Sequence, residues 1–136
     1  MLIVRWRTAT LFFLGAPGIC FATPTGDFIS RWRSATHAIE VKGASATPED
    51  AARSPEISAL FGEFAEAAQA YRTQIIDARA KKLTPRSCPP KGVDLTIDSM
   101  ISDIDKLPPD LKQRPFKESF AAVMDRRYPC HPGRPQ

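Results

Sequence analysis

The pair Cys88 and Cys130 constrains the fold of this chain more than any other feature of its sequence. Between the two cysteines, apolar residues recur at three and four positions in two segments, the spacing that places them on one face of a helix. They are Ile97, Met100, Ile101 and Ile104 in the first segment, and Phe116, Phe120, Val123 and Met124 in the second. Pro108 and Pro109 lie between the segments, where they cannot continue a helix. This pattern predicts an antiparallel helical hairpin whose open end is closed by a Cys88–Cys130 disulfide.

The first 22 residues have the features of a secretory signal peptide. Two arginines give a basic start, residues 11–14 are apolar, and Cys20-Phe21-Ala22 is a small-x-small cleavage sequence. The apolar run is too short to cross a membrane, and Pro17 and Gly18 interrupt it. We therefore expect cleavage after Ala22, a periplasmic location and no stable membrane anchor.

Removal of this leader also changes the cysteine count and the net charge. Residues 1–22 contain Cys20 and two arginines, so the mature chain keeps two cysteines and a net charge of +2 instead of +4. An even pair of cysteines in an oxidising compartment predicts a disulfide. The mild positive charge gives no indication of a nucleic-acid partner.

An all-α fold with four helices around one core is expected. Phe28, Trp32 and Ile39 share one helical face, with Thr25 or Asp27 as the cap. A Ser-Pro-Glu sequence at residues 54–56 begins the longest element, whose apolar stripe continues to Ile75. The expected helices span about residues 27–40, 55–80, 95–106 and 115–127. They form a single domain, residues 23–130, between the signal peptide (1–22) and a flexible tail (131–136).

Residues that could carry catalysis or bind a metal are sparse. His37 and His131 have no cysteine or carboxylate cluster near them in the sequence. Cys130-His131 lacks the additional cysteine that c-type haem attachment needs, and the two separate cysteines lack zinc-site spacing. Four aspartates cluster near the third helix, but a paired-carboxylate site is not expected. Asp94 suits the start of the helix, and the other three, Asp98, Asp103 and Asp105, are expected to face water. We expect no catalytic residue, no metal and no cofactor.

A partner-binding site is expected at the proline-rich break. Its residues are Pro108, Pro109, Asp110, Leu111 and Lys112. A rigid corner of mixed charge can enter a partner's cleft at a low ordering cost; a plain connecting turn is the alternative interpretation. The helically spaced aromatic residues are expected in the core: Phe28, Trp32, Phe61, Phe64, Phe116 and Phe120. The stripe from Ile57 to Ile75 suits either a core or a homodimer seam.

The second half of the chain resembles the Rap/Tai immunity proteins of type VI secretion. The residues that carry the resemblance are Cys88, Pro90, Val93, Leu107, Pro108, Phe120 and the sequence Tyr128-Pro129-Cys130. They lie within residues 87–130, about a third of the chain. Many members of the family have another cysteine pair that ties the first helix to the second, which this chain lacks. The resemblance therefore implies less about how the first half is arranged.

The resemblance implies a small, helical, periplasmic and often dimeric protein. Characterised members bind a peptidoglycan amidase effector and block its active-site cleft, so a toxin of this class is the expected partner. Two alternatives from other classes are open: a periplasmic chaperone of the small acid-activated helical kind, and a small enzyme such as a glycosidase that would use the aspartates of the third helix.

Overall fold

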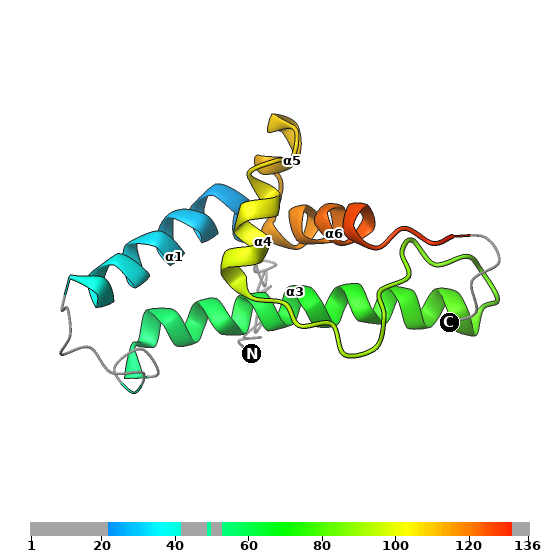
Figure 1. Ribbon diagram of the computed structural model, residues 1–136, viewed down its shortest axis with the longest axis horizontal. Coiled ribbons are helices and arrows are strands. Elements are labelled where there is room, and N and C mark those ends of the chain that lie inside the picture. The colour runs from blue at the N-terminus through cyan, green and yellow to red at the C-terminus, as the bar shows by residue number, and fades with distance from the viewer. Residues whose placement is uncertain (1–21, 42–48, 50–52, 132–136) are drawn as a thin grey trace, which may run out of the picture.

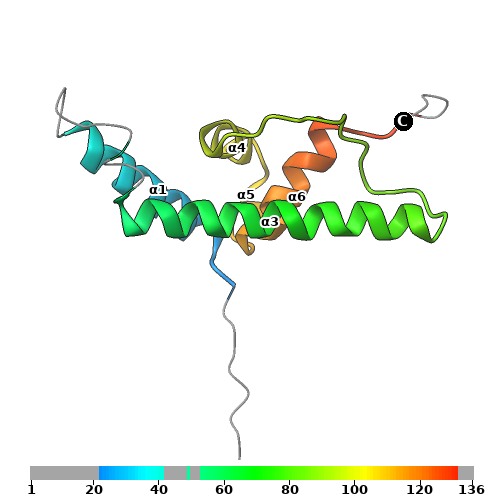
Figure 2. The same cartoon turned by 90° about the horizontal axis from the view of Figure 1, so that it is seen from below.

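The computed structural model describes residues 22–41, 49 and 53–131. The expected signal peptide, except Ala22, and the expected tail, except His131, lie outside these residues. The described residues form helices and no strand (Figures 1 and 2). The helices are α1 (Thr25–Glu40), α3 (Pro55–Ala80), α4 (Ile97–Ile104), α5 (Pro109–Lys112) and α6 (Phe116–Arg127). The all-α prediction is confirmed, and α5 is a helix that the four-helix prediction did not include.

Helix α3 is the longest of these elements and runs along most of the length of the molecule in Figure 1. Ser54 caps it by accepting a hydrogen bond from the backbone N–H of Ile57 at 3.4 Å. Pro55 occupies the first turn, where its missing N–H costs nothing. The predicted range of residues 55–80 is therefore confirmed.

Helix α6 is the centre of the packing. It contacts α1, α3, α4 and α5, and half of its residues are buried. Phe116 stacks on Phe28 of α1, with ring centroids 3.8 Å apart, and Phe120 meets the edge of Phe64 of α3 at 5.6 Å. The hydrophobic core therefore forms around α6. Its other fully buried large apolar side chains include Leu60, Met100 and Ile104.

The prediction that the aromatic residues lie in the core is confirmed for most of them but is wrong for Phe61. Phe28, Trp32, Phe116 and Phe120 are buried, and Phe64 is half-buried against them. The side chain of Phe61 is 54% exposed. Its ring lies nearly perpendicular to that of Trp32 of α1, with centroids 5.7 Å apart, but more than half of the side chain stays open to solvent.

The predicted antiparallel hairpin is also wrong in its geometry. Helix α4 stands steeply across α6 in Figure 1 and is seen end-on in Figure 2, so the two helices cross. Two features of the chain explain this. Residues 88–96 form a long loop that carries the chain away from the disulfide before α4 begins at its cap, Thr96. The extra turn of α5 then changes the direction of the chain between α4 and α6.

The start of α1 is fixed by contacts to α6 rather than by a side-chain cap. Pro24 is the N-cap residue and Thr25 is buried in the first turn, so the predicted cap at Thr25 or Asp27 is wrong. The Thr25 hydroxyl donates to the carbonyl oxygen of Arg114 at 2.6 Å and lies 2.7 Å from the hydroxyl of Ser119. The backbones of Pro24 and Pro115 form an isolated antiparallel bridge. These contacts join the beginnings of α1 and α6.

Three of the four aspartates near α4 form contacts between helices instead of only facing water. Asp98 accepts a hydrogen bond from the indole of Trp32 at 2.8 Å, and Asp105 pairs with Arg33 at 3.0 Å. Asp103 pairs with Arg127 of α6 and with Lys106 at 2.9 Å. The aspartates therefore hold α4 between α1 and α6.

Candidate partner-binding surface

The predicted partner-binding segment, residues 108–112, forms a corner around helix α5. Pro108 is its N-cap and Pro109 is in its first turn, so the two prolines start a helical turn instead of a plain break. The corner projects beyond α1 and α6 at the top of Figure 1. We call these five residues the α5 corner.

Internal hydrogen bonds hold the α5 corner rigidly on its supporting helices. The Lys112 ammonium donates to the backbone carbonyl of Asp105 at 2.6 Å. The Ser119 hydroxyl, buried in α6, donates to the carbonyl of Leu111 at 2.6 Å. Pro108, Pro109 and Asp110 are exposed, while Leu111 and Lys112 are half-buried. The structure therefore leaves the first three residues outward and uses the other two partly for support.

A hollow of about 500 Å³ adjoins the corner, between α3 and α6. Alanine side chains from both helices line it, together with charged side chains of both signs. Leu111 of the α5 corner also lines it, so the corner and the hollow form one continuous surface. The residues of this α3–α6 hollow are Ala67, Ala70, Tyr71, Gln74, Arg86, Leu111, Arg114, Lys117, Glu118, Ala121, Ala122 and Asp125.

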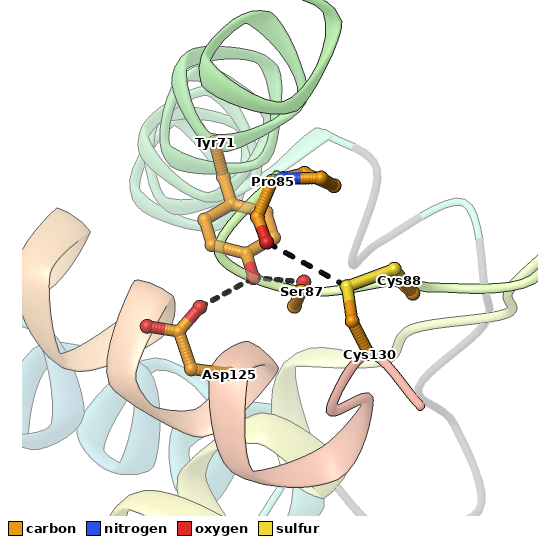
Figure 3. Close-up of a disulfide and its surroundings, with 6 residues drawn as sticks. All are labelled: Tyr71, Pro85, Ser87, Cys88, Asp125 and Cys130. Atoms are coloured by element: carbon orange, nitrogen blue, oxygen red, sulfur yellow. Dashed lines mark hydrogen bonds between the residues drawn. A yellow bond between two sulfur atoms is a disulfide. The ribbon is translucent and has the colours of Figure 1, made fainter. Parts of the chain in front are cut away.

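Tyr71, Arg86 and Asp125 line one part of the α3–α6 hollow and belong to a polar cluster around Tyr71. Figure 3 shows Tyr71 and Asp125 of this cluster together with Ser87. The Tyr71 hydroxyl projects from α3, donates to Asp125 of α6 at 2.7 Å and forms a second hydrogen bond with buried Ser87. Arg86 holds the same carboxylate with two nitrogens, at 2.9 and 2.5 Å, and lies over the Tyr71 ring at 5.4 Å. The cluster therefore ties the segment after α3 to the last turns of α6.

Burial and neighbouring charges determine the protonation states of Tyr71 and Arg86 in this cluster. Burial, more than any other influence, raises the pKa of Tyr71, and the neighbouring Asp125 carboxylate acts in the same direction. The hydrogen bond to Asp125 raises the pKa of Arg86. Tyr71 is therefore a neutral donor and Arg86 a permanent cation over the physiological range. Such a cluster can hold the conformation of the segments that it joins.

The predicted disulfide is confirmed. Cys88 and Cys130 are bonded, with their Cα atoms 4.9 Å apart. The backbone N–H of Cys88 also donates to the carbonyl of Tyr128 at 2.8 Å, and the sulfur of Cys130 lies 3.6 Å from the carbonyl oxygen of Pro85. The bond joins the loop before α4 to the segment after α6, next to the Tyr71 cluster (Figure 3).

Sequence reasoning identified the corner and the disulfide but missed the α3–α6 hollow and the Tyr71 cluster. Arg86 and Asp125 are 39 residues apart, and no local pattern indicates such a pair. The one sequence signal was Tyr71 itself, a residue with a polar group inside an apolar helical stripe, which needs a partner when it is buried.

Neither a metal site nor a membrane span emerges from the described residues. In residues 22–41, 49 and 53–131, no group of three or more His, Cys, Asp or Glu side chains could hold a metal ion. No helix in that part of the chain is long and apolar enough to cross a membrane. The sequence matches no family model and no curated protein, and the structure matches no solved structure. The resemblance to the Rap/Tai proteins therefore rests on residues 87–130 alone and stays a prediction.

Proposed function

We propose that this chain is an exported immunity-type protein that neutralises a peptidoglycan amidase by occluding its active site. The observation that carries the proposal is the α5 corner, where three exposed residues project from a support fixed by hydrogen bonds. A preformed convex corner can enter a cleft without losing much conformational entropy. The resemblance over residues 87–130 supplies the class of partner.

The charges around the corner suit a mixed polar contact. Asp110 is exposed, and its nearest cation, Arg114, is 3.9 Å away and also exposed. Arg114 also pairs with exposed Glu118 at 3.7 Å. Pairs so long and so open to water are weak, so Asp110 and Arg114 are both available to a partner. The α3–α6 hollow beside Leu111 offers a second area that a partner could fill.

The direct test uses the amidase encoded beside this gene, if one is present, or amidases of the same class. The protein processed from the full precursor should bind the amidase in calorimetry and stop its release of peptides from peptidoglycan. Asp110→Arg should weaken binding by at least about tenfold, because a reversed charge at a docked contact is repelled.

Asp77→Arg is the matched control, since Asp77 is exposed near the end of α3 and lines neither the α5 corner nor the α3–α6 hollow. It should bind like the wild type. If no amidase of the class binds, or if both variants bind alike, the occlusion proposal is wrong.

A second candidate is the acid-activated chaperone, and one observation favours it. Carboxylates hold peripheral segments to α6: Asp103 holds α4 through Arg127, and Asp125 holds the segment after α3 through Arg86. Protonation in acid would break these pairs and loosen apolar contacts. A dye that fluoresces on apolar surfaces should then respond between pH 7 and pH 2, and a flat response removes this candidate.

A further inference from the structure

A second hollow, of about 360 Å³, lies where the chain enters α1. We call it the N-terminal hollow. The backbone N–H of Phe116 donates to the carbonyl oxygen of Thr23 at 2.9 Å, and the N–H of Thr25 donates to the carbonyl of Arg114 at 3.0 Å. Ala22 and Thr23 both line the hollow. Because Thr23 lines the hollow and its carbonyl is anchored, the nitrogen of the same residue, two bonds from the carbonyl carbon, lies close to the hollow.

The opposite wall of the N-terminal hollow is acidic. Glu63 and Glu66 of α3 line it, together with Lys117 of α6. One oxygen of Glu63 accepts a hydrogen bond from Arg31 at 2.7 Å. Its other oxygen, Oε2, is buried and has no hydrogen-bond partner. A buried carboxylate oxygen without a donor is unfavourable, so Glu63 has room for one more hydrogen-bond donor in addition to Arg31.

We propose that the N-terminal hollow is the binding site for the α-ammonium group of Thr23, which forms when the leader is removed after Ala22. Hydrolysis breaks the bond between the carbonyl carbon of Ala22 and the nitrogen of Thr23. Water supplies the hydroxyl to Ala22 and a hydrogen to Thr23, whose amine then takes up a proton. A neutral amide with one hydrogen thus becomes a cation with three donors next to Glu63 and Glu66. This inference rests on the export that the proposed function assumes.

Processing would therefore complete the fold at this point. The new cation can donate to the partnerless oxygen of Glu63 and to Glu66, which strengthens the contact between the start of α1 and α3. It lies on the segment that also bridges Pro24 to Pro115. The charged groups that face it are Glu63 and Glu66 from α3 and Lys117 from α6, while Arg31 from α1 shares Glu63.

The pH dependence has a definite sign. Two carboxylates favour the ammonium form, while Lys117 and the Arg31 that already pairs with Glu63 oppose it. Because the carboxylates accept hydrogen bonds directly from the ammonium group, the pKa of the α-amine should exceed its ordinary value of about 7.7–8.0. The stabilisation is then complete below that ordinary value and is lost as the pH rises through the raised pKa.

The experiment measures the α-amine directly. The full precursor is expressed, the processed protein is recovered from the periplasm, and its N-terminus is identified by intact mass. The pKa of the amine is then obtained from the pH dependence of its acylation rate. We expect a raised pKa in the wild type, and a pKa lowered by about one unit in Glu63→Gln combined with Glu66→Gln.

Glu56→Gln is the matched control, because Glu56 also pairs with Arg31, at 2.6 Å, but does not line the hollow. It should keep the raised pKa. The proposed site is wrong if the pKa of the α-amine lies in the ordinary range, or if this pKa is the same in the double variant as in the wild type. A mature chain that does not begin at Thr23 also overturns it. Neither result involves the amidase, so the proposed binding function is tested separately.

Discussion

Tyr71 shows how one polar group can be accommodated at a buried position in this chain. Its ring is part of the core and packs against Phe120, with centroids 6.0 Å apart. Its hydroxyl has two partners, Ser87 and Asp125, from different parts of the chain. Removing the hydroxyl leaves both partners with one hydrogen bond fewer in a place that water does not reach freely.

We predict that Tyr71→Phe lowers the free energy of unfolding by about 1–3 kcal/mol, the usual cost of a buried group left without its partner. Urea unfolding followed by circular dichroism measures this. Thr73→Val is the control, because it removes an exposed hydroxyl that bonds only the carbonyl of Gln69 on the same helix. Equal unfolding midpoints for the Tyr71 variant and the wild type would contradict the role of the cluster.

Protonation of Asp103 should lower the stability of the fold in acid. Its hydrogen bond with Lys106, and then the one with Arg127, hold the pKa of the carboxyl below its usual range. The unfolded chain therefore binds protons on Asp103 at a higher pH than the folded chain does. The stabilisation is complete above an unfolded pKa of about 3.9 and is lost as the pH falls through the folded value.

We predict that Asp103→Asn is less stable than the wild type at pH 7 and loses less further stability between pH 4 and pH 2. The measurement is the urea midpoint across this range. Asp94→Asn is the control, since Asp94 is exposed in the loop before α4. If the urea midpoints of Asp103→Asn and the wild type fall in parallel as the pH is lowered, the Asp103 carboxylate does not contribute to the pH dependence of stability.

At the scale of elements, local signals in the sequence predicted where helices begin but not how they cross. Ser54 and Pro55 specify the start of α3, and the prediction there is confirmed. Pro108 and Pro109 were interpreted as a break, yet the same rule that places proline in a first turn makes them the start of α5. The crossing of α4 over α6 depends on the path of residues 88–96, which no periodicity describes.

The junction of α1 and α6 provides a test at this scale. We predict that Thr25→Val costs about 0.5–1.5 kcal/mol, because the Arg114 carbonyl loses the Thr25 hydroxyl and keeps only the backbone N–H of the same residue, while the volume stays nearly the same. The measurement is again urea unfolding. Thr36→Val is the control, as the Thr36 hydroxyl bonds only carbonyls of its own helix. Equal losses in the two variants would argue against a special role for the junction.

At the scale of the whole molecule, α6 joins parts of the chain that are far apart in sequence. The disulfide fixes the segment after α6, and the contacts of Thr25 with Arg114 and Ser119 fix the start of α6. The hydrophobic core packs around the helix between these two points. The fold class and the disulfide could be predicted because they follow from periodicity and cysteine count. The Tyr71 cluster and both hollows could not, because they form from residues that meet only after the helices have packed.

Replacing both Cys88 and Cys130 by serine should lower the free energy of unfolding by about 4 kcal/mol, the chain-entropy value for a loop of this length. The two cysteines are 42 residues apart, so the unfolded chain gains considerable freedom without the bond. Wild-type protein unfolded under reducing conditions should behave like the variant. A loss below about 1 kcal/mol would mean that the bond is not a main source of stability.

Amide hydrogen exchange on the processed protein, free and bound to its amidase, tests the central claim most directly. The account predicts slower exchange in the complex at the backbone amides of Asp110, Leu111 and Lys112, and unchanged exchange at the far end of α3 near Asp77. Protection confined to other surfaces, with the α5 corner exchanging as fast as in the free protein, would contradict it.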